Sequence, residues 1–194
     1  MVNKTKGAEH REKLREQLFP GEEAWTGEGE KGWFRAPRTL PLVLGLIDSK
    51  DLSDTKRPSN VYLELWARNM GEGLIEMKEP EEHAYCAGYF GSRGVRTWQE
   101  RMRILEKLGF IKIKEIANQK YKYVLLMHPA AVVEKLQAQG KVTQNWLDTY
   151  SVRQTETKEM TLKERQKARE AAAKIVNIKD SQRVGKKAAE PKAG

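Results

Sequence analysis

Residues 95–127 constrain the fold of this chain more than any other stretch. Four apolar side chains in its first half recur at helical spacing, within an arc of about 80°. They are Val95, Trp98, Met102 and Leu105. Gly109 follows this pattern at the place where glycine commonly ends a helix. Residues 110–116 and 121–127 then alternate apolar and polar side chains around a short polar turn. The stretch therefore predicts an amphipathic helix over residues 95–108, followed by a β-hairpin.

The elements predicted before this helix are mostly helical. They are a buried helix over residues 40–47, a charged linker over 48–58, a helix from Pro58 to Gly71, a short strand over 74–78, a short helix over 80–88 and a turn over 91–94. After the hairpin, Pro129 and Gly140 bracket another helix, and Thr143 is expected to cap the next. The order predicts a mainly α fold with one small β-hairpin.

The sequence R-T-x-Q-x-x-M-x-x-L-E-K-L-G-F-I runs from Arg96 to Ile111. It resembles the recognition helix and first wing strand of bacterial winged helix-turn-helix regulators, whose helix commonly ends in L-E-x-L-G-[LF]-I. The resemblance covers residues 59–127 and departs from the common pattern at residues 91–94, where glycines and an arginine replace a serine-rich cap. It implies a winged helix-turn-helix with extra N- and C-terminal helices. It also implies the DNA-binding role of a transcription regulator or of a plasmid replication or partition protein.

The side of the predicted helix opposite the apolar arc is polar and charged. A helix in the major groove reaches bases mainly from its first turns. Arginine can make two hydrogen bonds to guanine and glutamine two to adenine, whereas glutamate accepts from cytosine. We expect base contacts from Arg96, Thr97, Gln99 and Glu100, and phosphate contacts from Arg93, Arg103 and Lys107. The alternative is an ordinary amphipathic helix with a charged outer face.

The hairpin is expected to supply a second contact with DNA. Its inward-facing residues are predicted to be Ile111, Ile113, Tyr121, Tyr123 and Leu125. The predicted wing residues are Asn118, Gln119, Lys120 and Lys122, a composition suited to backbone or minor-groove contact. Lysines on an edge strand also prevent aggregation, so the same residues have a second explanation.

The net charge of +9 is concentrated in two segments. Residues 93–126 hold nine basic and three acidic residues, and residues 161–194 hold ten and four. A basic stripe on a structured element is the usual electrostatic signature of a polyanion partner, although a solvated charged face is the ordinary alternative. The basic tail is equally compatible with a nonspecific DNA-binding arm, a solubilising end or a partner-binding helix.

The chain is expected to have four parts. They are an N-terminal arm (1–38), a winged-helix domain with a leading helix (39–127), C-terminal helices that pack on it or form a dimer interface (128–158), and a basic helical or disordered tail (159–194). One recognition helix reads few base pairs, so a homodimer is expected. The candidate dimer surfaces are residues 40–47, 132–136 and 146–150 and the tail helix, which a Thr161–Glu164 capping box begins.

The histidines and the single cysteine do not form a recognisable chemical site. His10, His83 and His128 are scattered, so a metal site is not expected. Cys86 is expected to be a buried structural thiol, and one cysteine forms no internal disulfide. The glycine pattern at residues 27–32 matches a dinucleotide-binding motif, but no predicted strand precedes it. We expect no metal, no cofactor and no enzymatic activity.

The longest apolar run, residues 40–47, is far shorter than the roughly 20 residues that cross a bilayer. With no secretory signal at its N-terminus, the chain is expected to be cytoplasmic and associated with the nucleoid. We expect sequence-specific binding of double-stranded DNA by a transcriptional regulator. The alternatives are a plasmid or phage replication-initiation or partition protein, a protein-interaction module that uses the basic face, and an RNA-binding protein that uses Tyr121 and Tyr123.

Overall fold

The computed structural model describes residues 6–21, 24, 31–161, 163–168 and 171 of the 194. The chain divides into two compact units, Met1–Trp33 and Phe34–Gly194. The boundary therefore falls before residue 38, the predicted end of the arm. The first unit contains helix α1 (Lys6–Leu18). Among the described residues, no helix combines the length and apolar composition that crossing a membrane requires.

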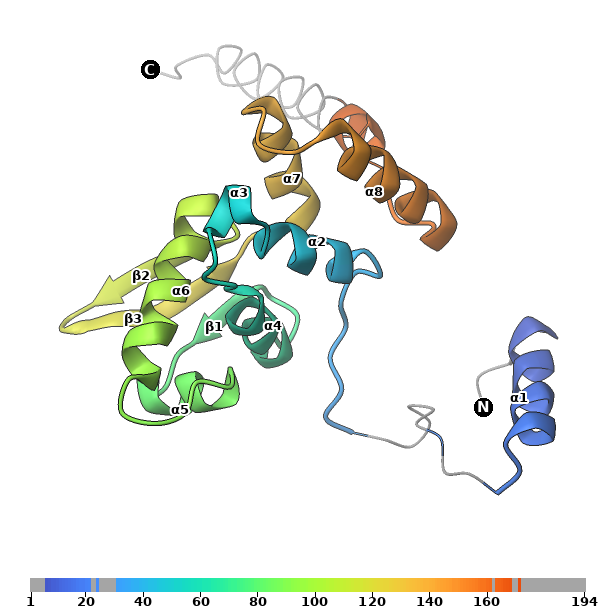
Figure 1. The fold of residues 1–194 in the computed structure, drawn as a ribbon, viewed down its shortest axis with the longest axis horizontal. Coiled ribbons are helices and arrows are strands. Elements are labelled where there is room, and N and C mark those ends of the chain that lie inside the picture. The colour runs from blue at the N-terminus through green and yellow to red at the C-terminus, as the bar shows by residue number, and fades with distance from the viewer. Residues whose placement is uncertain (1–5, 22–23, 25–30, 162, 169–170, 172–194) are drawn as a thin grey trace, which may run out of the picture. The chain divides into compact units, whose positions relative to one another are not determined.

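The second unit is mainly helical and contains one small antiparallel sheet (Figure 1). Its elements are α2 (Leu40–Ile47), α3 (Lys50–Ser53), α4 (Ser59–Arg68), β1 (Leu74–Glu76), α5 (Pro80–Cys86), α6 (Gly94–Leu108), β2 (Ile111–Ile116), β3 (Gln119–Leu126), α7 (Pro129–Ala138) and α8 (Gln144–Thr157). The predicted mainly α class with a β-hairpin is confirmed. The short helix α3 was not predicted and lies inside the predicted linker.

Local signals in the sequence set several helix ends. Gly109 has φ 88°, and the amide that follows it, on Phe110, donates to the Leu105 carbonyl at 3.0 Å. This is the left-handed ending that glycine permits. The Thr143 hydroxyl accepts from the Trp146 amide at 3.4 Å at the start of α8. The predicted capping box also forms, since the Thr161 amide donates to the Glu164 carboxylate at 2.8 Å.

Strand β3 is central, and β1 and β2 pair with it in antiparallel fashion. The β2–β3 register is irregular between Lys114 and Ile116, so the inward-facing residues of β3 do not alternate strictly. Tyr121 is buried as predicted, but the next buried residues are Val124 and Leu126. The prediction that Leu125 faces the core is wrong, because its side chain is 38% exposed on the other face of the strand.

The core is built around the apolar face of α6. Trp98, Met102 and Leu105 are fully buried, as their spacing predicts. The Trp98 ring meets Tyr121 of β3 edge to face, with ring centroids 5.0 Å apart. Tyr62 of α4 meets Phe110 in the same way at 5.3 Å. The first contact joins α6 to the hairpin, and the second joins α4 to the short connection between α6 and β2.

The helices that flank this core bury their apolar faces within the same chain. The buried residues include Leu40, Val43, Leu46 and Ile47 of α2, Val132, Val133 and Leu136 of α7, and Leu147 and Tyr150 of α8. A further link joins the segment after α8 to the residue before α2, since the Glu159 carboxylate accepts from the Thr39 amide at 3.0 Å and from its hydroxyl at 2.7 Å. The candidate dimer surfaces at residues 40–47, 132–136 and 146–150 are therefore largely buried by contacts within one chain.

Cys86 departs from its predicted environment. It is the last residue of α5 and is exposed, whereas we expected a buried thiol. The neighbouring Ala84 and Ala87 take the buried positions instead. The short helix presents only one face to the core, and Cys86 lies outside that face.

Candidate nucleic-acid interface

The turn before α6 depends on two glycines for different reasons. Gly91 has φ 82°, a conformation that favours glycine. Gly94, the first residue of α6, comes so close to the Tyr89 backbone that a Cβ would lie 2.3 Å from the Tyr89 carbonyl oxygen. This close approach explains why glycine, and not a residue with a side chain, stands at position 94. These two positions set the start and direction of α6.

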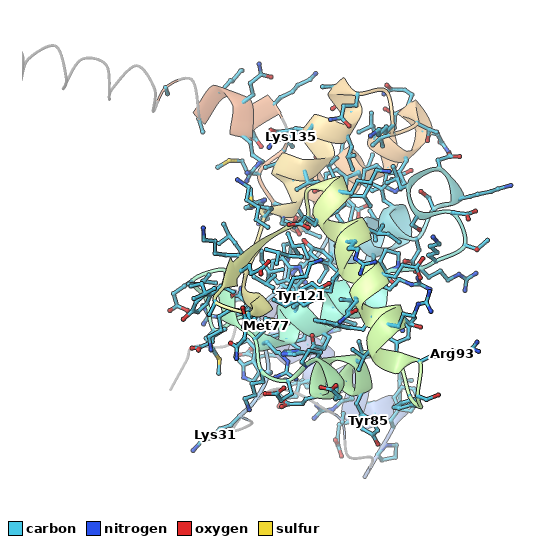
Figure 2. All side chains as sticks on the ribbon, turned by 90° about the vertical axis from the view of Figure 1, so that its left-hand side faces the viewer. Lys31, Met77, Tyr85, Arg93, Tyr121 and Lys135 are labelled. Atoms are coloured by element: carbon cyan, nitrogen blue, oxygen red, sulfur yellow. The ribbon has the colours of Figure 1, made fainter. Side chains whose placement is uncertain are left out.

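A basic ridge of three residues runs along the outward face of α6. Arg96, Arg103 and Lys107 are all exposed, and at 100° per residue they fall within an arc of about 40°. At 1.5 Å per residue, the ridge extends for roughly 16 Å along the helix. Arg93 is also exposed and lies at the outer edge of this face (Figure 2). Among the residues that the structure describes, none of these four side chains forms an ion pair.

The remaining residues expected to contact bases do not share the ridge direction. Gln99 is half-buried and lies about 60° from Arg96, on the side of the hairpin. Thr97 is also half-buried and lies about 100° from Arg96 on the other side. The sequence pattern grouped them because they share the first turns of the helix. The structure places only Arg96 in the most exposed direction.

Glu100 forms two ion pairs that the sequence did not predict. Its carboxylate lies 2.7 Å from the Lys56 ammonium and 2.9 Å from the Arg101 guanidinium. The Lys56 ammonium, helped by Arg101, holds the pKa of Glu100 below its ordinary value. Both carboxylate oxygens therefore already have cationic partners, unlike the free acceptor that a contact with cytosine requires. Lys56 is the residue of this site that sequence reasoning missed, because it comes from the loop before α4.

A cleft of about 860 Å³ separates α6 from the hairpin. Its lining brings together Gln99 and Arg103 of α6 with the predicted wing residues Asn118, Gln119, Lys120 and Lys122. The side chain of Tyr121 extends from β3 of the hairpin toward α6, where its ring contacts Trp98 (Figure 2). Burial raises the pKa of its hydroxyl, and the Arg103 guanidinium opposes this rise. Two of the predicted helix residues, Gln99 and Arg103, thus share this cleft with the predicted wing residues.

The charges around the cleft are mixed. Glu76, Glu79 and Glu82 also line it, together with Lys78. Lys122 pairs with Glu76 at 2.7 Å, and this carboxylate raises the pKa of the Lys122 ammonium. Lys120, by contrast, is exposed at the tip of the hairpin. Around this cleft, the exposed cations without a described ion pair therefore include those of the α6 ridge and Lys120 at the hairpin tip.

A buried polar cluster lies behind α6. The His83 ring is fully buried and stacks on Trp98 with centroids 5.8 Å apart. Its Nε2 accepts from the Lys78 amide at 3.0 Å, so its Nδ1 carries the proton that it donates to Glu64 at 3.0 Å. Glu64 also pairs with Arg68, which reaches Glu82 at 3.1 Å. This cluster connects α4, α5 and α6 and supports the ridge from the inside.

The described residues hold no group of three or more histidine, cysteine or acidic side chains that could bind a metal ion. Most of the glycine pattern at residues 27–32 and most of the basic tail lie outside the described residues. Comparison with known family models, with curated proteins and with solved structures finds no match to this chain.

Proposed function

We propose that this chain binds double-stranded DNA as a winged helix-turn-helix protein. In this proposal, α4, α5 and α6 form the helical part, α6 is the recognition helix, and β2 and β3 form the wing. The order of the elements and the meeting of α6 with the hairpin support it. The observation that carries the proposal is the exposed basic ridge of Arg96, Arg103 and Lys107, without ion pairs among the described residues.

The roles that we propose for individual residues follow from their positions and ion pairs. Arg96 lies in the first turn of α6 and in the most exposed direction, so it is the principal candidate for a base contact. Arg93, Arg103 and Lys107 suit phosphate contacts. Glu100 is better suited to holding Lys56 and Arg101 in place than to accepting from cytosine, because both its oxygens are engaged.

Binding to labelled duplex DNA and to RNA, measured by fluorescence anisotropy at several salt concentrations, tests the proposal. Contact with six phosphates predicts a log–log salt slope near about −5 for duplex DNA. Stronger binding to RNA would favour the RNA-binding alternative. The absence of binding to either nucleic acid at low salt would favour a protein-interaction module.

Three variants distinguish residues that contact bases from residues that contact phosphates. Arg96→Ala should reduce discrimination between a selected site and random DNA by roughly 1–3 kcal/mol. Lys107→Ala should weaken binding to all sequences about equally. Lys135→Ala is the matched control, because this exposed lysine lies on α7, outside α6 and the hairpin (Figure 2). Equal behaviour of the Arg96 and Lys107 variants would contradict the division of roles.

We further propose that the protein is a transcriptional regulator that acts as a homodimer. Selection of bound fragments from a genome distinguishes this role from replication or partition, because a regulator's sites lie near promoters. Two half-sites separated by about 34–36 Å would indicate a two-fold symmetric dimer. A single undivided site bound by one chain would contradict the dimer.

A further inference from the structure

The loop between α3 and α4, residues 54–58, has an uncommon backbone conformation. Asp54 has φ 57° and Arg57 has φ 44°. Residues other than glycine rarely adopt a positive φ, and such conformations cost about 1–3 kcal/mol each. They persist only where the surrounding structure fixes them, and such positions gather at functional sites. Two of them in one short loop require an explanation.

Contacts from three elements fix this loop. At its end, the Asp48 carboxylate accepts from the Ser59 amide at 2.9 Å and from its hydroxyl at 2.6 Å. The Tyr89 hydroxyl donates to the Arg57 carbonyl at 3.4 Å. In the middle of the loop, Lys56 pairs with Glu100 of α6 at 2.7 Å. The loop is thus tied both to α6 and to the turn that precedes it.

The loop borders the basic ridge on the side opposite the hairpin. Around the axis of α6, Gln99 lies on one side of Arg96 and Glu100 lies on the other. Gln99 faces the hairpin cleft, whereas Glu100 pairs with Lys56 of the loop. In Figure 2, α6 runs through the middle of the face, with the hairpin on one side and the segment from α2 to α3 on the other. Lys56 is neutralised by Glu100, whereas Arg57 is exposed and forms no ion pair with a described residue. Arg57 is therefore the cation of this loop that forms no ion pair with a described residue.

We propose that Arg57 and the loop around it contact the DNA backbone on the side of the major groove opposite the hairpin. This inference rests on the proposed function, since it assigns a second backbone contact to the same site. The major groove is about 12 Å wide and has a phosphate strand along each side. A helix in the groove is held in register best when both strands are contacted. The hairpin tip faces one strand, and the loop faces the other.

Two glycine substitutions in this loop test the proposal. Arg57→Gly and Asp54→Gly each place glycine at a position of positive φ, so both relieve strain and loosen the loop. Only Arg57→Gly removes a positive charge. We expect it to weaken binding to a random duplex roughly 8-fold at 0.1 M salt and to reduce the salt slope by about 0.9, the effect of one lost phosphate contact. Asp54→Gly should not weaken binding.

Circular dichroism and thermal unfolding check that both variants are folded, and Arg57→Gln replaces Arg57→Gly if the latter is not. Unchanged affinity and slope in the Arg57 variant, together with weakened binding by Lys107→Ala, would overturn this inference and leave the proposed function intact. Equal weakening by both glycine variants would assign the effect to loop conformation and also overturn it. Failure of the unmodified chain to bind duplex DNA would instead reject the proposed function.

Discussion

Replacement of Gly94 by alanine tests the steric account of the turn before α6. The added Cβ would lie 2.3 Å from the Tyr89 carbonyl oxygen and 3.1 Å from its carbon, and contacts under 3.0 Å require a shift. Both atoms belong to the backbone, so no side-chain rotation relieves the overlap. The start of α6 must therefore move away from the turn by at least about 0.7 Å.

The expected size of the effect follows from two opposing contributions. Overpacking in a tight region costs about 1–3 kcal/mol, and a backbone neighbour places this substitution toward the upper end. Alanine in a helix is favoured over glycine by up to about 1 kcal/mol. We therefore expect the free energy of unfolding to fall by about 2 kcal/mol. For a chain of this size, the melting temperature should drop by roughly 4–8 °C.

Gly45→Ala is the matched control. Gly45 also lies within a helix, α2, and a Cβ there would meet nothing within 4 Å. This variant should gain about 0.5–1 kcal/mol. Urea unfolding followed by circular dichroism measures both variants under the same conditions. Equal stability of the Gly94 and Gly45 variants would refute the argument that the close approach to Tyr89 requires glycine.

Four other changes have expected outcomes. Trp98→Ala should cost about 3–5 kcal/mol in urea unfolding, because the ring is fully buried between two aromatic neighbours. Glu159→Ala should lower the free energy of unfolding by about 1–3 kcal/mol, because it removes two hydrogen bonds to the buried Thr39. The control is Glu156→Ala, which breaks only an exposed ion pair and should cost under about 0.5 kcal/mol. Cys86 should react with a thiol reagent in the native state as fast as in urea, and protection would contradict its exposed position. The lowered pKa of Glu100 means that its ion pairs stabilise the fold above its unfolded pKa of about 4.3 and that this stabilisation is lost as the pH falls through the lowered value. The melting-temperature difference between the unmodified chain and Glu100→Gln should therefore be small at neutral pH and shrink further as the pH falls below the unfolded pKa, and a difference that grows on acidification would contradict the pairing.

Local patterns were sufficient to predict most of the helices and the hairpin, though not the short α3, because the residues that set them are neighbours in the sequence. Gly109 ends α6, Thr143 caps α8, and the spacing of Trp98 and Met102 sets the buried face of α6. The irregular register of β3 was not predictable in this way, because it depends on how β2 pairs with it. As a result, the inward position assigned to Leu125 was wrong.

The composition of the candidate interface depended on contacts between distant segments. Helical spacing placed Glu100 beside Arg96, but no local pattern indicated that Lys56 would reach it from the loop before α4. In the same way, His83 was a scattered histidine in the sequence and becomes a buried hydrogen-bonding partner of Glu64 in the fold. Charged residues have several possible partners along the chain, and only the tertiary arrangement selects among them.

The distribution of charge on this face also determines where a duplex would lie on it. The cleft beside the hairpin contains Glu76, Glu79 and Glu82, of which Glu76 pairs with Lys122 and Glu82 with Arg68. Phosphates placed inside the cleft would approach carboxylates, which disfavours binding there. The ridge residues Arg96, Arg103 and Lys107, and Arg57 of the loop, form no ion pair with a described residue. The proposed duplex axis therefore lies over α6 and toward the α3–α4 loop, with the hairpin reaching the backbone only at its tip.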